Sequence, residues 1–160
     1  MIRSLDKHTS LVAGSLFSGG GLGDVGIEWG LGIPVLGACE IIASRAVLLE
    51  RNFPQTKVFA GDVRELQNDY VSFFQKRLRK KTPWLLTLSP PCQGMSSNGA
   101  GRISASIRNG NRPKEDERNR LILPGINILE KLKPDWYVLE NVRRMAVSYT
   151  HLRAHETSLH

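Results

Sequence analysis

The feature that most constrains the fold is a regular alternation of short apolar stretches with segments of helical periodicity. The apolar stretches have the length and β-branched content of strands and lie at residues 11–17, 35–39, 57–60, 84–89 and 136–139. Helical patterns lie between them, at residues 22–29, 43–52, 63–79 and 120–132. Such alternation forms βαβ units, in which helices cover both faces of a parallel sheet. We therefore predict a doubly wound α/β fold with a mostly parallel sheet.

Residues with binding or catalytic chemistry follow every predicted strand. Glycines follow the first strand, Glu40 the second, Asp62 the third, Cys92 the fourth, and Glu140 with Asn141 the fifth. The carboxyl ends of parallel strands meet at one edge of the sheet, and doubly wound folds bind their ligands there. The sequence therefore predicts one composite site at this edge.

Composition narrows the class of protein. The chain has 160 residues, enough for one domain with a buried core, and 41% of them are hydrophobic. It contains no apolar run long enough to span a bilayer, and it begins with no secretory h-region. Its two cysteines are too few for a disulfide framework and suit a reducing compartment. We expect a protein that is cytoplasmic in a prokaryote or phage, or nuclear in a eukaryote, and not secreted.

The formal net charge of +7 is compatible with a polyanionic partner such as nucleic acid. Basic residues gather in two places. The group at residues 76–81 is typical of a solvated helix end. The second group follows Cys92 and is placed to contact phosphates; it consists of Arg102, Arg108, Arg112, Lys114, Arg118 and Arg120. Part of it lies within residues 94–114, a segment rich in Gly, Ser, Asn and Arg that we interpret as a mobile lid.

A glycine-rich segment, FSGGGLGDVG at residues 17–26, follows the first strand and opens a helix. Gly21, Gly23 and Gly26 match the pattern G-x-G-x-x-G, and Glu40 follows at the distance of an acid that binds ribose hydroxyls. S-adenosylmethionine also presents a ribose diol, so this geometry suits it as well as a dinucleotide. The turn therefore predicts a nucleoside cofactor without choosing between the two.

Asp62 has two interpretations that the sequence leaves open. Its carboxylate is placed to accept a hydrogen bond from an adenine amino group, and equally to cap the helix that begins at Val63. Cys39 ends an apolar strand, and we expect it to be a buried thiol that packs as a small hydrophobic group.

The most specific stretch is Ser89-Pro90-Pro91-Cys92-Gln93-Gly94. Two prolines restrict the backbone at the end of the strand, so that Cys92 is presented in a defined direction. A thiol at this edge of the sheet, close to basic side chains, is suited to react as a thiolate. Glu140 follows a neighbouring strand and is a candidate proton donor beside this nucleophile.

Taken in order, the motifs FSGGGLGD, an acid after the second strand, GD, PPCQG, RNRL and ENV resemble the cytosine-C5 DNA methyltransferases. The resemblance covers about residues 11–145. It departs from the family at Leu22, where many members have a further glycine, and at Met95, where Phe is commoner. It implies S-adenosylmethionine as the cofactor, no metal, and double-stranded DNA with a flipped-out cytosine as the partner. The oligomeric state is left open, with a monomer as the expectation.

The resemblance also implies a role for individual residues. Cys92 would be the nucleophile and Glu140 would hydrogen-bond N3 of the base, while Pro91 would offer its carbonyl to the exocyclic amine. The remaining substrate-binding residues would be Gln93, Asn141 and Val142. The cofactor-binding residues would be Phe17, Gly19, Gly21, Glu40, Ile41, Asp62, Val63 and Leu121. Among these, Glu40 would bind the ribose hydroxyls, Asp62 the adenine amino group, and Leu121 would pack on the adenine.

The family's later elements, including its target-recognition region, do not follow ENV. We therefore expect residues 1–146 to be a partial catalytic domain that is inactive or nearly so, and poorly stable, by itself. Residues 147–160 have no amphipathic period and are interpreted as a non-native tail. Three alternatives remain: a tRNA cytosine-C5 methyltransferase of the same family, a nicotinamide-dependent oxidoreductase, and a non-catalytic nucleic-acid-binding protein that retains the fold.

Overall fold

The protein is described by a computed structural model at residues 11–79, 82–91 and 120–141. These residues form the parallel sheet that the sequence predicts, and its strand order is β3-β2-β1-β4-β5. The strands are β1 (Ala13–Leu16), β2 (Val35–Glu40), β3 (Lys57–Ala60), β4 (Leu85–Leu88) and β5 (Trp136–Leu139). The helical elements are α1 (Leu22–Val25), η1 (Gly26–Gly30), α2 (Ala43–Asn52), α3 (Val63–Arg77) and α5 (Ile122–Leu132).

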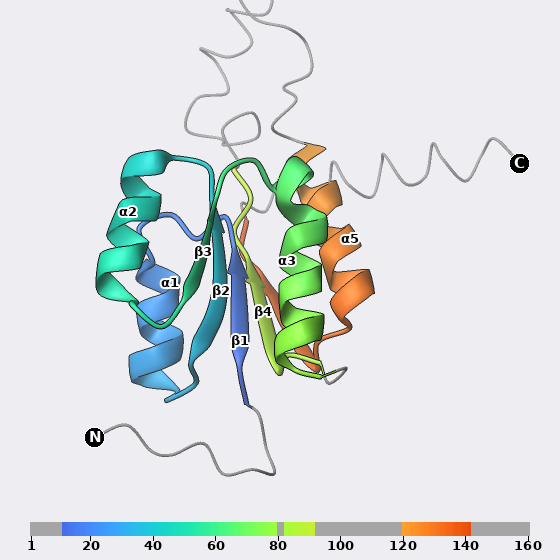
Figure 1. Cartoon of the computed structure of the whole chain (residues 1–160), viewed down its shortest axis with the longest axis horizontal. Helices are drawn as coiled ribbons and strands as arrows, with labels where there is room; N and C mark the ends of the chain where they lie inside the picture. The colour runs from blue at the N-terminus through green and yellow to red at the C-terminus, as the bar shows by residue number, and fades with distance from the viewer. Residues whose placement is uncertain (1–10, 80–81, 92–119, 142–160) are drawn as a thin grey trace, which may run out of the picture. The chain divides into compact units, whose positions relative to one another are not determined.

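The chain divides into two compact units. The first unit, Met1–Ser89 with Ile122–Glu140, contains every helix and strand named above. Within it, α1 and α2 cover one face of the sheet, and α3 and α5 cover the other (Figure 1). This two-sided covering is the doubly wound arrangement that the alternating sequence pattern predicts. The second unit is Pro90–Leu121 with Asn141–His160.

The segment after β1 differs from the single regular helix predicted for residues 22–29. Its first turn, α1, is α-helical, but Gly26–Gly30 then forms the wider π-helical turn η1. The amides of Leu31 and Ile33 both donate to the carbonyl of Ile27, at 3.2 and 3.3 Å. Glycines at both ends of η1 lower the steric cost of this irregular turn, which a periodicity argument does not reveal.

Two strand glycines admit large aromatic side chains from α3. Tyr70 is fully buried, and its hydroxyl donates toward the carbonyls of Ser15 (3.3 Å) and Gly37 (3.1 Å). A Cβ at Gly14 would lie 2.5 Å from the Tyr70 oxygen and 2.8 Å from Cζ of Phe74. Small residues in the strands are therefore required for this helix to approach the sheet.

Gly14→Ala is expected to destabilise the fold by about 1–3 kcal/mol, because the added methyl group overpacks this contact. Urea unfolding followed by circular dichroism measures the change. Gly30→Ala is the matched control, since a Cβ there meets no atom within 4 Å. Equal stability of the two variants would show that α3 shifts to accommodate the methyl group.

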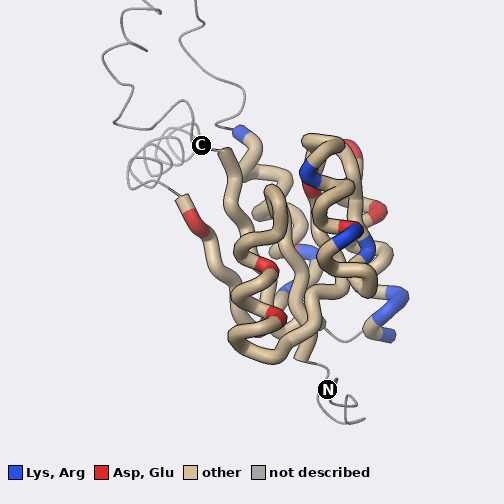
Figure 2. Tube along the Cα trace, turned by 90° about the vertical axis from the view of Figure 1, so that its left-hand side faces the viewer, with Lys and Arg blue, Asp and Glu red and all other residues tan. Residues whose placement is uncertain are grey.

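Charged residues are almost absent from the strands. The exceptions are Glu40, the last residue of β2, and Lys57, the first residue of β3; the other charges along the described trace lie on helices and connections (Figure 2). Lys76, Arg77 and Arg79 are exposed at the end of α3, so this part of the basic cluster is a solvated helix end, as predicted. Among the described helices, none is long and apolar enough to cross a membrane.

Candidate cofactor and active site

The turn after β1 is shaped by three residues with positive φ: Phe17 (59°), Gly19 (58°) and Gly21 (86°). The amide of Ser18 donates to the carbonyl of Cys39 at 3.0 Å, and the amide of Gly21 donates back to Ser18 at 2.9 Å. These bonds hold the turn against the exit of β2. An added Cβ at Gly19 would meet no atom within 4 Å, so the outer side of the turn leaves room for a ligand.

Glu40 is the carboxylate that joins the exits of β1 and β2. It is buried, at 4% exposure. One oxygen accepts from the amide of Gly19 at 2.8 Å, and the other accepts from the amide of Ile42 at 2.9 Å. Each carboxylate oxygen has a second lone pair, so this pairing leaves acceptor capacity for a ligand hydroxyl. Two residues predicted to bind the cofactor, Gly19 and Glu40, are thus in direct contact.

Asp62 caps α3, which confirms one of its two open interpretations. Its side chain accepts from the amide of Arg64 at 2.8 Å and pairs with the Arg64 guanidinium at 2.6 Å. The hydrogen bond from the Arg64 side chain lowers the pKa of Asp62. The neighbouring amide of Gly61 donates to the carbonyl of Glu40 at 2.9 Å, so the end of β3 is tied to the end of β2.

Asp62→Ala is expected to cost about 1 kcal/mol of stability at pH 7, because α3 loses its cap. The lowered pKa means that this contribution is present above the unfolded value of about 4 and is lost as the pH falls below it. Thermal unfolding at pH 7 and pH 3 measures both effects. Asp62→Asn keeps a capping acceptor and is expected to lose less; an equal loss would assign the stabilisation to the ion pair instead.

A buried polar cluster that the sequence motifs do not predict lies beneath the glycine turn. The hydroxyl oxygens of Ser15 and Ser18 are 2.6 Å apart, and Ser15 also hydrogen-bonds the carboxyl of Asp24. Asp24 is 2% exposed, and its Oδ2 atom has no hydrogen-bond partner. Burial raises the pKa of Asp24 to about 6, with a hydrogen bond from Ser15 opposing the shift and the charge of Glu28 adding to it.

A signal for this cluster exists in the sequence. Asp24 lies three residues before Ile27, so the two side chains share one helix face, and Ile27 is a buried core residue. The spacing places the carboxyl on the face of the helix that packs against the sheet. Within the glycine pattern, however, Asp24 occupies a position that the motif leaves unspecified.

The ends of β4 and β5 form the opposite part of the edge. The amide of Glu140 donates to the carbonyl of Leu88 at 2.9 Å, and the hydroxyl of Ser89 donates to Oε2 of Glu140 at 3.2 Å. The Glu140 side chain is exposed. The predicted catalytic carboxylate is thus tied to the strand that precedes the predicted nucleophile, by a serine that sequence analysis did not single out.

The other predicted residues are placed as follows. Phe17 is half-buried, Ile41 is exposed, Val63 is buried at the start of α3, and Cys39 is buried, as predicted. In the second unit Pro91 and Leu121 are half-buried, and the Asn141 side-chain amide donates to the carbonyl of Pro90 at 2.8 Å. The predictions for Cys92, Gln93 and Val142, for the lid at residues 94–114 and for the tail at 147–160 lie outside the described residues.

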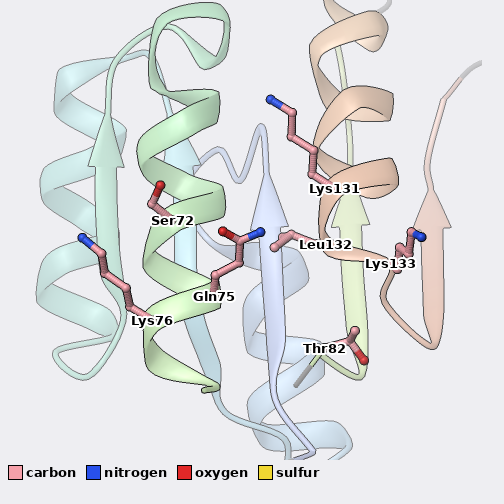
Figure 3. Close-up of a pocket in the computed structure, with 7 residues that line it drawn as sticks. All are labelled: Ser72, Gln75, Lys76, Thr82, Lys131, Leu132 and Lys133. Carbon is pink, nitrogen blue, oxygen red and sulfur yellow. The ribbon is translucent and has the colours of Figure 1, made fainter. Parts of the chain in front are cut away.

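A hollow lies between α3 and α5, at the end of the strands opposite to the candidate site. It has a volume of about 540 Å³ and is lined by Ser72, Gln75, Lys76, Thr82, Lys131, Leu132 and Lys133. Thr82 precedes β4 and Lys133 precedes β5, so these residues are remote from the strand exits. Its lysines do not converge, since Lys76 directs its ammonium group away from α5 (Figure 3). No cluster of three or more His, Cys, Asp or Glu that could hold a metal occurs in the part of the chain that the structure describes.

Comparison with known proteins gives consistent results. A type II methyltransferase of Avibacterium volantium, M1.HgaI, is 36% identical over 128 residues, which are 80% of this chain and 33% of that protein. The type II methyltransferase M.AquIA of Picosynechococcus is 30% identical over 134 residues, 82% of this chain and 48% of that protein. The chain therefore spans a third to a half of the length of these relatives.

The fold likeness extends to a solved structure. A DNA modification methyltransferase encoded within an E. coli prophage superimposes with a TM-score of 0.66 over 91% of this chain and 36% of its own, at 24% identity. The family model of C-5 cytosine-specific DNA methylases matches residues 12–159. The glycine turn, the Glu40 bridge and the paired exits of β4 and β5 are thus features of a chain that belongs to the C-5 cytosine-specific DNA methylase family.

Proposed function

We propose that this chain is the cofactor-binding and nucleophile-bearing part of a DNA cytosine-C5 methyltransferase that uses S-adenosylmethionine. The observation that carries the proposal is the Glu40 carboxylate, buried at 4% exposure and fixed by amides from the exits of two strands. Its orientation is set before any ligand binds. A preorganised pair of acceptors suits a ribose diol, which offers two adjacent donors.

The residues around Glu40 also fit the nucleoside cofactor. Gly19 leaves room for a ligand on the outer side of the turn, and Ile41 presents an apolar side chain that is 62% exposed. Asp62 lies at the next strand exit, where both of its carboxylate oxygens accept from Arg64, so it would receive the adenine amino group when the exposed Arg64 side chain moves aside. The proposed nicotinamide alternative has no such support, since the family is one of methylases.

In the proposed reaction, the thiolate of Cys92 forms a bond to carbon 6 of a flipped-out cytosine. The electron pair of the 5,6 double bond moves toward carbon 5, and a hydrogen bond or proton at N3 from Glu140 favours this addition. When bound, S-adenosylmethionine supplies the methyl group that carbon 5 accepts. Loss of the carbon-5 proton then restores the double bond, and the bond between sulfur and carbon 6 breaks.

Ser89 gives Glu140 a fixed partner in this scheme. The hydroxyl at 3.2 Å holds one carboxyl oxygen, which leaves the other free to turn toward the base. The family's partner is double-stranded DNA, and the basic residues 102–120 would contact its phosphates.

Mechanism-based trapping tests the proposal. The chain is joined to the C-terminal remainder of M1.HgaI and incubated with S-adenosylmethionine and duplex DNA that contains 5-fluorocytosine. A covalent adduct that maps to Cys92 is expected, because fluorine is not eliminated as the proton is. Cys92→Ser is the control and should give none. An adduct on a fluorinated tRNA but not on DNA would move the assignment to the RNA-modifying branch, and cofactor binding without any adduct would refute the role of Cys92.

A further inference from the structure

The last strand of the described sheet exposes an unbroken run of apolar side chains. β5 is the strand that follows Lys133 in Figure 3, and it stands at the end of the strand order, with β4 on one side. Its side chains are between 44% and 64% exposed: Trp136, Tyr137, Val138 and Leu139. The strand contains no lysine or proline, the residues that commonly protect a free edge from pairing. An apolar patch of this kind marks an interaction surface.

The backbone of β5 also offers hydrogen-bonding groups on its outer side. The amides of Trp136 and Glu140 donate to carbonyls of β4, at 2.8 and 2.9 Å. Because peptide groups alternate in direction along a strand, the N–H and C=O groups of Tyr137 and Leu139 point away from β4. The outer edge therefore presents two donors and two acceptors to a further strand.

The side chains of β5 divide between the two faces of the sheet. Leu139 pairs in register with Leu88, a residue that approaches α5, so Leu139 and Tyr137 lie on the side of α3 and α5. Trp136 pairs with a residue of β4 whose core cluster includes η1, so Trp136 and Val138 lie on the side of α1 and η1. A partner strand must match both faces as well as the edge.

An antiparallel second copy meets all of these requirements. A two-fold axis perpendicular to the sheet keeps each face on its own side, so residues that stand opposite each other come from the same face. When Tyr137 stands opposite the partner's Leu139, the symmetric pair forms as well, and all four outward groups of each copy are hydrogen-bonded. Each such pair joins an aromatic to an aliphatic side chain, which stabilises a cross-strand contact. Val138 then meets the partner's Val138 on the axis.

We propose that β5 is a self-association edge, at which two copies of this chain pair antiparallel in this register and join their sheets into one. The inference is independent of the proposed function, and it departs from the monomer that the family resemblance leads us to expect. The net charge of +7 opposes association, but β5 carries none of it, and salt screens the remainder. The same register sets the partner's Trp136 opposite Glu140, so the association surface reaches the candidate catalytic carboxylate.

Size-exclusion chromatography with light scattering measures the association of the 160-residue chain. The mass is expected to rise from that of one chain toward that of two over about a hundredfold increase in protein concentration, because dimerisation follows mass action. Val138→Lys sets two ammonium groups against each other on the axis and is expected to weaken association about tenfold or more. Val47→Lys, at a similarly exposed valine of α2, is the matched control and should leave association unchanged.

Cysteine cross-linking tests the register. In a Cys92→Ser background, Val138→Cys is expected to form a disulfide between two copies under mild oxidation. The Cα atoms of a non-hydrogen-bonded antiparallel pair lie about 4.5 Å apart, which is within the range of a disulfide. Tyr137→Cys is the control, because the two substituted residues would lie diagonally across the strands, about 7–8 Å apart and beyond that range. Cys39 is buried and should not react.

Each contrary outcome identifies what is wrong with the proposal. A chain that stays monomeric at every concentration would overturn it, and protection of the Tyr137 and Leu139 amides from hydrogen exchange in that monomer would assign the edge to a segment of the same chain. A dimer that Val138→Lys leaves intact would be held by another surface. Preferential cross-linking of Tyr137→Cys would refute the register. Circular dichroism checks that each variant is folded, and Val138→Cys, a small change at an exposed residue, provides a result even if Val138→Lys unfolds.

Discussion

Asp24→Asn is expected to stabilise the folded chain by about 2 kcal/mol at pH 8 and to have little effect at pH 4. Burial raises the pKa of Asp24 from 3.8 to about 6, so ionisation costs the folded state roughly 3 kcal/mol at neutral and alkaline pH. Asparagine removes the charge, but its buried amide lacks full pairing and returns about 1 kcal/mol of that gain.

The sign follows from proton linkage. The folded state binds the Asp24 proton more tightly than the unfolded state, so the stability of the wild-type chain falls as the pH rises from about 4 to about 6, and this contribution is level above that window. Urea unfolding of both proteins across pH 4–8 measures the difference between them. Asp69→Asn, an exposed acid changed in the same way, should show no such trend. A stability difference that is constant with pH would mean that Asp24 has the same pKa in the folded and unfolded states, so that burial does not raise it.

Gly21→Ala is expected to destabilise the chain by about 3–4 kcal/mol, the largest loss among the glycine substitutions of the turn. Gly21 has φ of 86°, which costs an L-residue about 1–2 kcal/mol. The added Cβ would also lie 2.5 Å from Cε2 of Phe53 and 2.8 Å from Cδ2 of Leu49, both buried side chains of the core. Overpacking of this kind costs about 1–3 kcal/mol.

Two neighbouring glycines separate these causes. Gly19 shares the positive φ, at 58°, but its added Cβ meets nothing within 4 Å, so Gly19→Ala should lose about 1–2 kcal/mol. Gly23 has neither a positive φ nor a close neighbour, so Gly23→Ala should be neutral or slightly stabilising. Equal losses at Gly19 and Gly21 in urea unfolding would show that the core around Phe53 adapts and that only the backbone conformation matters.

Most substitutions at a buried position destabilise the fold, whereas removal of the Asp24 charge is expected to stabilise it. A stability gain of this kind is common where a functional site retains a poorly solvated group.

Much of the fold could be predicted from the sequence because hydrophobic periodicity reports burial directly. The bounds predicted for α2, β3 and β5 agree with the structure, and β2 extends by one residue to include Glu40. The predicted first strand is longer than the observed Ala13–Leu16, because apolar residues continue beyond both ends of the regular strand. The π-helical turn η1 was missed, because a change from one helical hydrogen-bond pattern to another leaves no periodic signal.

The site was predicted as a set of positions rather than as a network. Because Glu40, Asp62 and Glu140 each follow a predicted parallel strand, the sequence predicted that they lie at the same edge of the sheet. The observed parallel sheet places all three at the carboxyl ends of its strands. The sequence did not show that Glu40 bridges Gly19 and Ile42, nor that Ser89 contacts Glu140, since such bonds depend on the register of strands far apart in the chain. Asp24 was overlooked for a different reason: a motif built on glycines assigns no role to the residues between them.

The Glu40 bridge has a further consequence for the dynamics of this edge. Because one carboxylate holds the amides of both Gly19 and Ile42, neither amide can exchange with solvent without release of the same side chain. These two hydrogens should therefore exchange at similar rates, although the residues belong to different strand exits. A ligand that binds Glu40 would slow both together, so the loop of β1 and the start of α2 would open and close as a single unit.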